Sequence, residues 1–456
     1  MKTGNLRARS LIVASAALIF PWFLASCQVA PPTAIATDLG VIETLPVTSV
    51  SVETPTDSPI GTPTPAPQPT VPLILEASEV GYIIPLHVQH KTQDQLMLMF
   101  ELDTALAGRV YWWPAEGSHQ NAGYIPFEAG AARQLIRIPG LAAGQTYQMA
   151  VGLEGDDSFD RMPLFLGEPW GPIEVSTLSE PLTPITIGVV GDSGFGEDIT
   201  ADLAAQLAQH QPDFIVHTGD LVYLAYQEGS PQAAYQQKWY QTLSSLLRKT
   251  VIYPVVGNHE MDDDTTYEGV PYYFHAFPIF EGLEGGWPEA PEGAERQWYA
   301  LELGALQIIF LNTQQLYGGA GRAAQDAWLT TRLQDDSFDA TMVVFHVPPF
   351  TSGRHGLDGR VVASSWVQAF EQSNVFLVLS GHDHNYERLE QNGITYVVSG
   401  GGSTLLYPRQ EQLAQSIHFE AKSHYVLLEI SEKSVGLQVY DADGQLIDTT
   451  TLAWQE

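Results

Sequence analysis

The pattern of hydrophobic and polar positions changes near residue 180 and separates two regions of different architecture. Between residues 73 and 180, short runs such as Leu96–Phe100, Arg109–Trp113 and Gln134–Ile138 are separated by Gly, Pro, Asp and Asn. Short runs of this kind between turn-forming residues are typical of β-strands. The pattern therefore predicts an all-β domain over residues 73–180.

One stretch of this region narrows the prediction. The segment Gly144–Val151, which follows Leu141, resembles the tyrosine-corner region of a fibronectin type III sandwich, with Tyr147 as the corner. The pair Trp112–Trp113 has two interpretations, a carbohydrate-binding surface or packing in the core. We find no candidate catalytic cluster in this region.

From Pro184 onward, apolar strands alternate with helical patterns. Helices are predicted at Ile199–Ala208, at residues 232–248 and at Gln325–Leu333. Apolar strands are predicted at Ile185–Val190, Phe214–His217, Val251–Val256, Thr341–His346, Val375–Ser380, Ile394–Val398, Tyr425–Ile430 and Val435–Tyr440. Strand–helix alternation indicates βαβ units, in which helices cover the faces of a sheet. We therefore expect a mixed α/β (α+β) domain over residues 181–456.

Length and charge limit the possible functions. A chain of 456 residues is too long for one hydrophobic core, so two folded domains are expected. It has 53 acidic and 20 basic residues, a net charge of −33. Such a chain is a poor candidate for binding nucleic acid. An anionic substrate would need a strong local positive centre, such as a metal cluster, because the overall field repels it.

Residues 1–26 have the organisation of a signal peptide. Basic residues precede an apolar run, Leu11–Phe23, that is too short to span a bilayer comfortably. The following sequence, Leu-Ala-Ser-Cys, resembles the lipobox of bacterial lipoproteins. The resemblance implies lipidation of Cys27, the only cysteine in the chain, and an extracytoplasmic protein anchored to the membrane of the cell envelope. The alternative is an ordinary signal peptide with an incidental cysteine.

The segment that follows is rich in proline and threonine. Residues 27–72 include the run Thr-Pro-Thr-Pro-Ala-Pro and contain no Lys or Arg. A segment of this composition does not bury enough apolar area to offset its conformational entropy. We expect a disordered stalk between the anchor and the folded domains.

Five short motifs with polar side chains lie at the ends of predicted strands in the second region. They are Gly191-Asp192-Ser193-Gly194, Gly219-Asp220-Leu221-Val222-Tyr223, Gly257-Asn258-His259-Glu260, Val343-Val344-Phe345-His346 and Gly381-His382-Asp383-His384. Strand ends in an α/β sheet meet at one crevice, so these segments can converge. Carboxylate, imidazole and amide groups bind hard or borderline cations, and because none of the five motifs contains cysteine, they do not form a thiolate site. Seven candidate ligands suit two metals about 3.5–4 Å apart.

Together and in this order, the motifs match the pattern of purple acid phosphatases: G-D-x-G, G-D-x-x-Y, G-N-H-[D/E], V-x-x-H and G-H-x-H. The chain is similar to this family from about residue 182 to its C-terminus. Larger members also have an N-terminal fibronectin-like domain. Other metallophosphoesterases have a metal-binding histidine at the position of Gly194. This chain lacks that histidine but has Tyr223, three residues after Asp220, and this combination fits the tyrosinate–iron branch. The resemblance implies a four-layer αββα metallophosphoesterase domain.

The resemblance also implies a role for each candidate ligand. Ferric iron would be held by Asp192, Asp220, Tyr223 and His384. A divalent ion (zinc, manganese or iron) would be held by Asp220, Asn258, His346 and His382, with Asp220 bridging. The implied activity is that of an acid phosphatase, the hydrolysis of small phosphate monoesters with metal-activated hydroxide as the nucleophile.

Two histidines are candidates for protonating the leaving group. His259, adjacent to Asn258, is the first, and His355, nine residues after His346, is the second. For His355 the alternative is a solvated loop histidine. Arg354 is a possible phosphate contact, and Glu260 is expected to orient its neighbours.

Other functions stay open from the sequence. A phosphodiesterase or nucleotide pyrophosphatase would use the same metal centre. A non-catalytic cell-surface binding protein predicts at least one broken ligand position, and all seven are filled. A carbohydrate-active protein would need a separate pair of carboxylates, which no feature identifies. The acidic, Gly/Pro-rich segment 262–295 is a possible insertion over the rim of the pocket. Neither the natural substrate nor the oligomeric state follows from the sequence.

Overall fold

The computed structural model describes residues 80–153, 172–182, 184–267, 270–278 and 297–454. These residues fall within one unit, Gln68–Glu456. The predicted signal peptide, Cys27 and the stalk lie outside the described residues, as does the predicted insertion from residue 279 onward, and these stay predictions. Within the described residues, no helix has the length and apolar character needed to cross a membrane.

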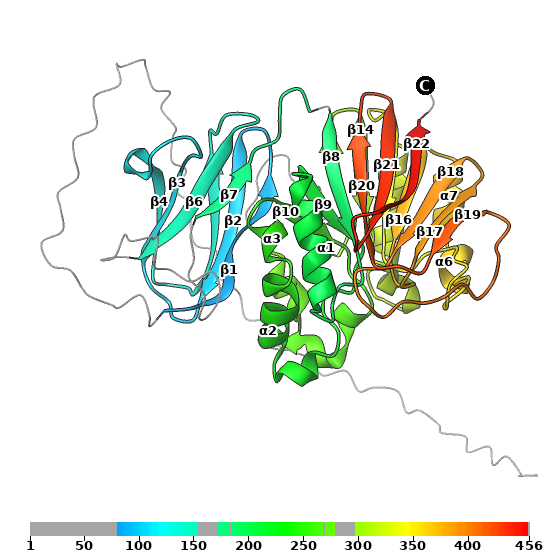
Figure 1. The fold of residues 1–456 in the computed structure, drawn as a ribbon, viewed down its shortest axis with the longest axis horizontal. Helices are drawn as coiled ribbons and strands as arrows, with labels where there is room; N and C mark the ends of the chain where they lie inside the picture. The colour runs from blue at the N-terminus through cyan, green and yellow to red at the C-terminus, as the bar shows by residue number, and fades with distance from the viewer. Residues whose placement is uncertain (1–79, 154–171, 183, 268–269, 279–296, 455–456) are drawn as a thin grey trace, which may run out of the picture. The chain divides into compact units, whose positions relative to one another are not determined.

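The predicted all-β region forms two antiparallel sheets (Figure 1). One has the order β1-β2-β5, formed by β1 (Tyr82–Lys91), β2 (Gln95–Leu102) and β5 (Arg133–Pro139). The other has the order β4-β3-β6-β7, formed by β4 (Gly123–Phe127), β3 (Gly108–Pro114), β6 (Thr146–Leu153) and β7 (Ile173–Ser176). Three predicted strands fall within β2, β3 and β5.

Two aromatic residues of this region are held by hydrogen bonds. The hydroxyl of Tyr147 accepts a hydrogen bond from the backbone N–H of Ala142, at 2.9 Å. Trp113 is buried, and its indole N–H donates to Gln148 Oε1 at 3.0 Å, which favours the core-packing interpretation for this tryptophan. The assignment to the fibronectin type III class stays a prediction.

The second region is built on two further sheets. The β8 sheet has the order β10-β9-β8-β20-β21-β22, formed by β10 (Val251–Pro254), β9 (Phe214–His217), β8 (Ile185–Val190), β20 (His424–Ile430), β21 (Ser434–Asp441) and β22 (Leu446–Ala453). The β15 sheet has the order β13-β14-β15-β16-β18-β17-β19, formed by β13 (Tyr299–Leu303), β14 (Leu306–Phe310), β15 (Ala340–Val344), β16 (Val375–Ser380), β18 (Ile394–Ser399), β17 (Tyr386–Gln391) and β19 (Ser416–Glu420). A short ribbon pairs β11 (Thr266–Tyr267) with β12 (Val270–Pro271).

Parallel pairing links the strands that precede the motifs. In the β8 sheet, β9 pairs in parallel with both β8 and β10. In the β15 sheet, β15 pairs in parallel with β14 and β16, and β16 with β18. The carboxyl ends of these strands therefore lie at a common edge of each sheet, and the prediction of a mixed α/β region is confirmed.

The described residues include seven α-helices. Their bounds are α1 (Asp198–Gln209), α2 (Pro231–Ala234), α3 (Ser244–Leu247), α4 (Tyr272–Ala276), α5 (Arg322–Leu333), α6 (Gly359–Ala363) and α7 (Ser365–Glu371), with short 3₁₀ turns η1 (His119–Asn121), η3 (Ala225–Glu228), η5 (His259–Met261), η6 (Asp263–Thr265) and η7 (Thr313–Tyr317). The helix predicted over residues 232–248 is interrupted by a π-helical segment, Tyr235–Gln241. There Thr242 Oγ1 donates to Gln237 O, five residues earlier.

Alternating residues of β15 define the layers. Met342 and Val344 belong to the core shared with the β8 sheet, whereas Val343 packs with Leu329 of α5 and Trp366 of α7. On the far side, α1 lies alongside the β8 sheet (Figure 1). A Cβ at Gly188 of β8 would lie 2.8 Å from Leu207 Cδ2 of α1, so glycine permits this close packing. The two sheets thus lie between outer helices.

Polar contacts connect β1 to the second region. Gln89 Nε2 donates to the carbonyl of Ala276 at 2.9 Å, and His90 hydrogen-bonds the Tyr253 hydroxyl on β10. The side chains of Gln89, His90 and Tyr253 are all buried. The all-β region therefore packs against the edge of the β8 sheet that is formed by β10.

Candidate metal centre

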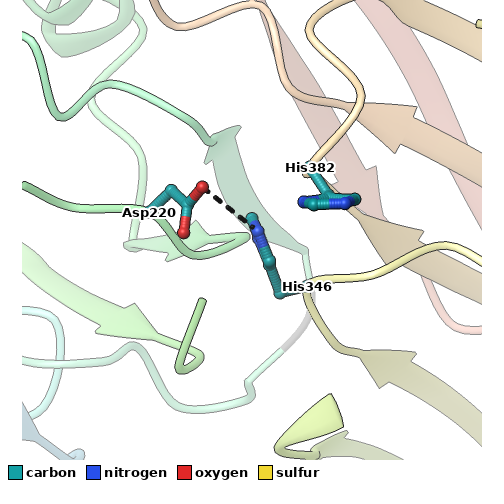
Figure 2. Close-up of side chains that lie close together, drawn as sticks. All are labelled: Asp220, His346 and His382. Atoms are coloured by element: carbon teal, nitrogen blue, oxygen red, sulfur yellow. Dashed lines mark ion pairs between the residues drawn. The ribbon is translucent and has the colours of Figure 1, made fainter. Parts of the chain in front are cut away.

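All seven candidate ligands lie just beyond strand ends at the common edge of the two sheets. The β8 sheet contributes the oxygen donors: Asp192 follows β8, Asp220 and Tyr223 follow β9, and Asn258 follows β10. The β15 sheet contributes the imidazoles: His346 follows β15, and His382 and His384 follow β16. Figure 2 shows Asp220, His346 and His382 facing one another across the gap between segments of the two sheets.

Three of these side chains project from backbone in the left-handed region. Asp192, Asp220 and His382 have φ values of 56°, 57° and 66°. This region is sparsely populated by residues other than glycine, and such outliers cluster at functional sites. The backbone turns sharply after β8, β9 and β16, which aims each side chain at the same space.

A first group joins Asp192, Tyr223 and His384. The Tyr223 hydroxyl lies 3.1 Å from Asp192 Oδ1 and 3.2 Å from His384 Nε2. His384 Nε2 lies 3.5 Å from Asp192 Oδ1. Asp192 is fully buried and the other two are nearly so, which keeps the three polar groups in a water-poor environment.

A second group joins Asp220, Asn258, His346 and His382. His346 Nε2 lies 3.3 Å from Asp220 Oδ2 and 3.2 Å from Asn258 Oδ1. One potential ligand atom each from Asp220, His346 and His382 lies within 4.8 Å of the others. Asp220 also interacts electrostatically with Asp192 of the first group.

Backbone carbonyls set the orientation of two imidazoles. His346 Nδ1 lies 2.8 Å from Thr218 O, and His384 Nδ1 lies 2.7 Å from Leu405 O. A carbonyl only accepts hydrogen bonds, so each Nδ1 carries the proton and donates it. In the neutral ring, each Nε2 then directs a lone pair into the centre. This is the arrangement in which supporting hydrogen bonds orient metal-binding histidines.

These lone pairs provide a test of whether the residues fit cations. His346 Nε2 faces the oxygens of Asp220 and Asn258, and His384 Nε2 faces Asp192. Acceptors at such distances repel one another unless a proton or a cation lies among them. The donor set of carboxylate, phenol, amide and imidazole matches hard and borderline metals. The residues therefore fit a pair of cations.

The buried carboxylates of the centre also require positive charge nearby. Burial raises the pKa of the Asp192 carboxyl well above its ordinary value. Burial opposes the protonation of His346, but the carboxylates of Asp220 and Asp192, together with the hydrogen bond to Thr218 O, outweigh it and raise the pKa of this imidazole to about 10. A buried set of carboxylates thus takes up positive charge, as a proton in the absence of metal.

Glu260 connects two of the loops that carry the donors. Its carboxylate is buried and accepts from the backbone N–H groups of Asp220 (2.9 Å), Leu221 (2.7 Å) and Gly257 (2.8 Å). Burial raises its pKa to about 7. The expectation that Glu260 orients its neighbours agrees with these contacts, since it fixes the strand ends after β9 and β10 together.

Both candidate proton donors lie beside the centre. His259 packs edge-on against Tyr223, with ring centroids 4.6 Å apart, and its Nδ1 lies 2.7 Å from Asp262 Oδ2. His355 stacks on His382, with centroids 4.1 Å apart and an interplanar angle of 24°. His355 is thus a neighbour of the centre, although its loop contains no strand-end motif.

The structure adds residues that the sequence did not identify. Tyr407 stacks on His384, with ring centroids 4.4 Å apart. The Arg354 guanidinium lies over the ring of Tyr407, 4.8 Å from its centroid. Asp383 contacts the loop that carries His355. Asp383 lies inside a recognised motif, but at its variable position. Tyr407 belongs to no motif, so only the fold brings it to the centre.

The fold and the site define a class of protein. Residues 185–386 match the family model described as calcineurin-like phosphoesterase. The matched segment includes all seven convergent side chains. The chain therefore carries a calcineurin-like metallophosphoesterase domain.

Individual relatives are more specific. "Purple acid phosphatase 1" of Ipomoea batatas is 25% identical over 223 residues, which cover 46% of this chain and 44% of that protein. "Fe(3+)-Zn(2+) purple acid phosphatase 12" of Arabidopsis thaliana is 25% identical over 237 residues, 49% of this chain and 47% of that protein. The chain thus spans less than half the length of these curated relatives.

The fold likeness extends further along the chain. A purple acid phosphatase from yellow lupin (Lupinus luteus) seeds superposes with a TM-score of 0.62 and 17% identity, covering 81% of this chain and 74% of that one. Residues 181–456 make up less than 81% of the chain, so the likeness in fold extends into the residues that precede them.

Proposed function

We propose that the protein hydrolyses small phosphate monoesters at a binuclear Fe(III)–M(II) centre, as an acid phosphatase of the purple type. The observation that carries the proposal is the convergence of seven donors from two sheets into two groups that interact through Asp220. The similarity to a relative named as an Fe(3+)-Zn(2+) enzyme supports the choice of metals.

The two groups suggest how the ligands divide. Asp192, Tyr223 and His384 would hold the ferric ion together with Asp220. Asn258, His346 and His382 would hold zinc, manganese or ferrous iron, with Asp220 shared. When bound, the cations supply a water of lowered pKa and positive charge to offset that of the phosphoryl group.

The chain's own residues prepare the substrate site. Carbonyls of Thr218 and Leu405 orient two imidazoles, and Glu260 fixes the loops that carry the oxygen donors. Arg354, held over Tyr407, would contact a phosphate oxygen. A net charge of −33 disfavours anions elsewhere, so this local arrangement would select them.

Hydrolysis also needs a proton for the departing alkoxide. His259 and His355 both lie against side chains of the centre and both pair with a carboxylate. A proton donor of this kind contributes about 10²–10⁴-fold to the rate. Either ring would hold its proton toward the leaving oxygen while the opposite nitrogen bonds the carboxylate.

The test combines metal analysis with a panel of phosphoesters. The purified protein is expected to contain two metal ions per chain, including iron, and to hydrolyse p-nitrophenyl phosphate faster than its bis-ester. A strong preference for the diester would favour the phosphodiesterase alternative. A metal-free protein without hydrolysis of either ester would contradict the proposal.

Variants locate the activity. His346→Ala and Asn258→Ala are expected to reduce kcat/KM by more than the roughly 10–100-fold that loss of a supporting hydrogen bond costs a metal site. His210→Ala is the control, because His210 lies at the end of α1 and bonds Tyr425 rather than the centre. Equal activity in His346→Ala and His210→Ala would place the reaction elsewhere.

A further inference from the structure

Asp383 occupies the variable position of the Gly-His-Asp-His motif, between two side chains of the metal centre. Its side chain is fully buried, with 0% exposed. Its hydrogen-bond partners belong to the loop that precedes α6. A buried carboxylate is costly unless it is hydrogen-bonded, so its partners indicate its role.

The carboxylate of Asp383 gathers the loop 351–355. The Thr351 hydroxyl donates to Oδ2 at 2.6 Å, and the backbone N–H of Arg354 donates to Oδ1 at 2.9 Å. The backbone N–H of His355 lies 3.3 Å from Oδ2, and its ring Nδ1 lies 3.2 Å from Oδ1. One side chain therefore fixes both the backbone and the ring of His355.

The partner of Nδ1 determines how the His355 ring is presented. An ionised carboxylate only accepts hydrogen bonds, so Nδ1 carries a proton toward Asp383. Nε2, at the opposite edge of the ring, has no hydrogen-bond partner among the described residues. One face of the ring is stacked on His382, and 36% of the side chain is exposed. Nε2 is thus free to meet a substrate.

The other candidate, His259, is held less firmly. Its partner Asp262 is 47% exposed, and both residues belong to one short segment. Water screens such a pair and competes for its hydrogen bond. Asp383 is buried and belongs to a different segment from His355, so its bond links two loops in a low-dielectric environment.

We propose that Asp383 is the positioning residue of His355, and that it holds Nε2 of this ring toward the leaving oxygen of the substrate; this rests on the proposed function. As water adds its oxygen to phosphorus and the bond to the leaving oxygen breaks, the Nε2 proton passes to that oxygen. The products are an alcohol and inorganic phosphate. The attacking water releases a proton to solvent. The His355 ring then takes up a proton from solvent and returns to its starting state.

The experiment uses leaving groups of different basicity, because a good leaving group needs no proton. Wild-type and Asp383→Asn proteins are compared on an alkyl phosphate and on 2,4-dinitrophenyl phosphate. Asp383→Asn is expected to lower kcat on the alkyl ester about 10²-fold, with KM little changed, and to alter kcat on the dinitrophenyl ester by no more than a few-fold. Metal content and melting temperature are measured alongside.

A double-variant cycle tests whether Asp383 acts through His355. His355→Asn is expected to show the same dependence on the leaving group, and the double variant is expected to be no slower than either single variant. Thr351→Val is the matched control, since it removes another hydrogen bond of Asp383 and leaves His355 paired. It is expected to retain wild-type kcat on both esters within a few-fold.

Asp383→Glu keeps a carboxylate and provides a second variant if Asp383→Asn fails to fold or to bind metal. The proposal is supported if Asp383→Glu turns over the alkyl phosphate faster than Asp383→Asn does. If Asp383→Asn is unfolded, the comparison is made with His355→Asn instead. Equal losses on both esters, or additive losses in the double variant, overturn it. If the wild-type protein with metals hydrolyses neither ester, the proposed function itself fails, which is a separate result.

Discussion

At the residue scale, the centre is built on backbone conformations that cost free energy. The left-handed conformations at Asp192, Asp220 and His382 cost of order 1–3 kcal/mol each. Bonds from the surrounding loops oppose this cost. Glu260 accepts from the N–H of Asp220, and Asp192 itself accepts from the N–H of His382, at 3.1 and 3.0 Å. Candidate ligands thus also support one another's backbone.

Tyr223 allows a spectroscopic prediction. Burial, followed by the charge of Asp192, raises the pKa of its phenol well above the ordinary value, so it stays protonated unless a strong cation binds it. We expect the iron-loaded protein to be pink to purple from a phenolate–iron absorption, and Tyr223→Phe to lose this band while it folds normally. The visible spectrum and the iron content measure this.

Tyr407→Phe is the matched control for that experiment. Its ring stacks on His384, but no ligand role is assigned to its hydroxyl. The band should persist in this variant. An iron-containing wild-type protein without colour, or a Tyr223→Phe protein that keeps the band, would remove the tyrosinate assignment.

The sequence predicted the residues of the centre better than their surroundings. Asp192, Asp220, Asn258 and His346 each follow an apolar strand, so local pattern and the rule of shared strand ends suffice to bring them together. Tyr407 had no such signal, because its position depends on a long segment between β18 and β19. The hydrophobic periodicity of the sequence does not predict where a long loop places its side chains.

At the element scale, donor chemistry is divided between the sheets. The oxygen donors follow strands of the β8 sheet, and the imidazoles follow strands of the β15 sheet. Bound cations would therefore connect the ends of two sheets that already contact through apolar side chains and a few hydrogen bonds. Metal binding and the packing of the sheets are expected to stabilise each other.

Metal removal measures this connection. A metal ion present at 100 times the dissociation constant of its site stabilises the folded state by about 2.7 kcal/mol. Chelation is therefore expected to lower the melting temperature by about 5 °C or more, given roughly 2–4 °C per kcal/mol in large domains. Differential scanning calorimetry with and without chelator gives the shift. His346→Ala should show a smaller shift, and identical curves for the loaded and chelated wild-type protein would contradict the prediction.

Element prediction was most accurate for buried parallel strands. Ile185–Val190, Phe214–His217 and Val375–Ser380 coincide with β8, β9 and β16. The hairpin β13–β14 was not predicted, although Gly304, with φ 64°, separates its two apolar runs. The long helix expected over residues 232–248 is interrupted by a π-helical segment, in which Trp239 packs against His217 at the end of β9.

At the scale of the whole molecule, several buried histidines lie away from the centre. Burial lowers the pKa of His87 in β1 and of His424 in β20 to about 4, below the unfolded value of 6.5. The unfolded chain therefore binds more protons between these values. Their contribution to stability is full above pH 6.5 and is lost as the pH falls toward 4.

His87→Gln tests this pH dependence. The shift from 6.5 to about 4 corresponds to roughly 3 kcal/mol of unfolding free energy at full burial. We expect the wild-type protein to lose stability between pH 6.5 and 4, and the variant to lose less over the same interval. Urea unfolding across pH gives both curves, and values at pH 8 isolate the packing change. Parallel curves would show that His87 is not responsible.

The position of β20 has a consequence for biosynthesis. This strand lies between β8 and β21, so the sheet that carries Asp192 and Asp220 needs residues 424–453 for completion. A ribosome that has just passed His384 has already produced every candidate ligand, yet the growing chain lacks half of that sheet. The centre therefore forms after nearly the whole polypeptide has been translated. Cations bound at this centre would then be acquired where the finished chain folds, from the ions of that compartment.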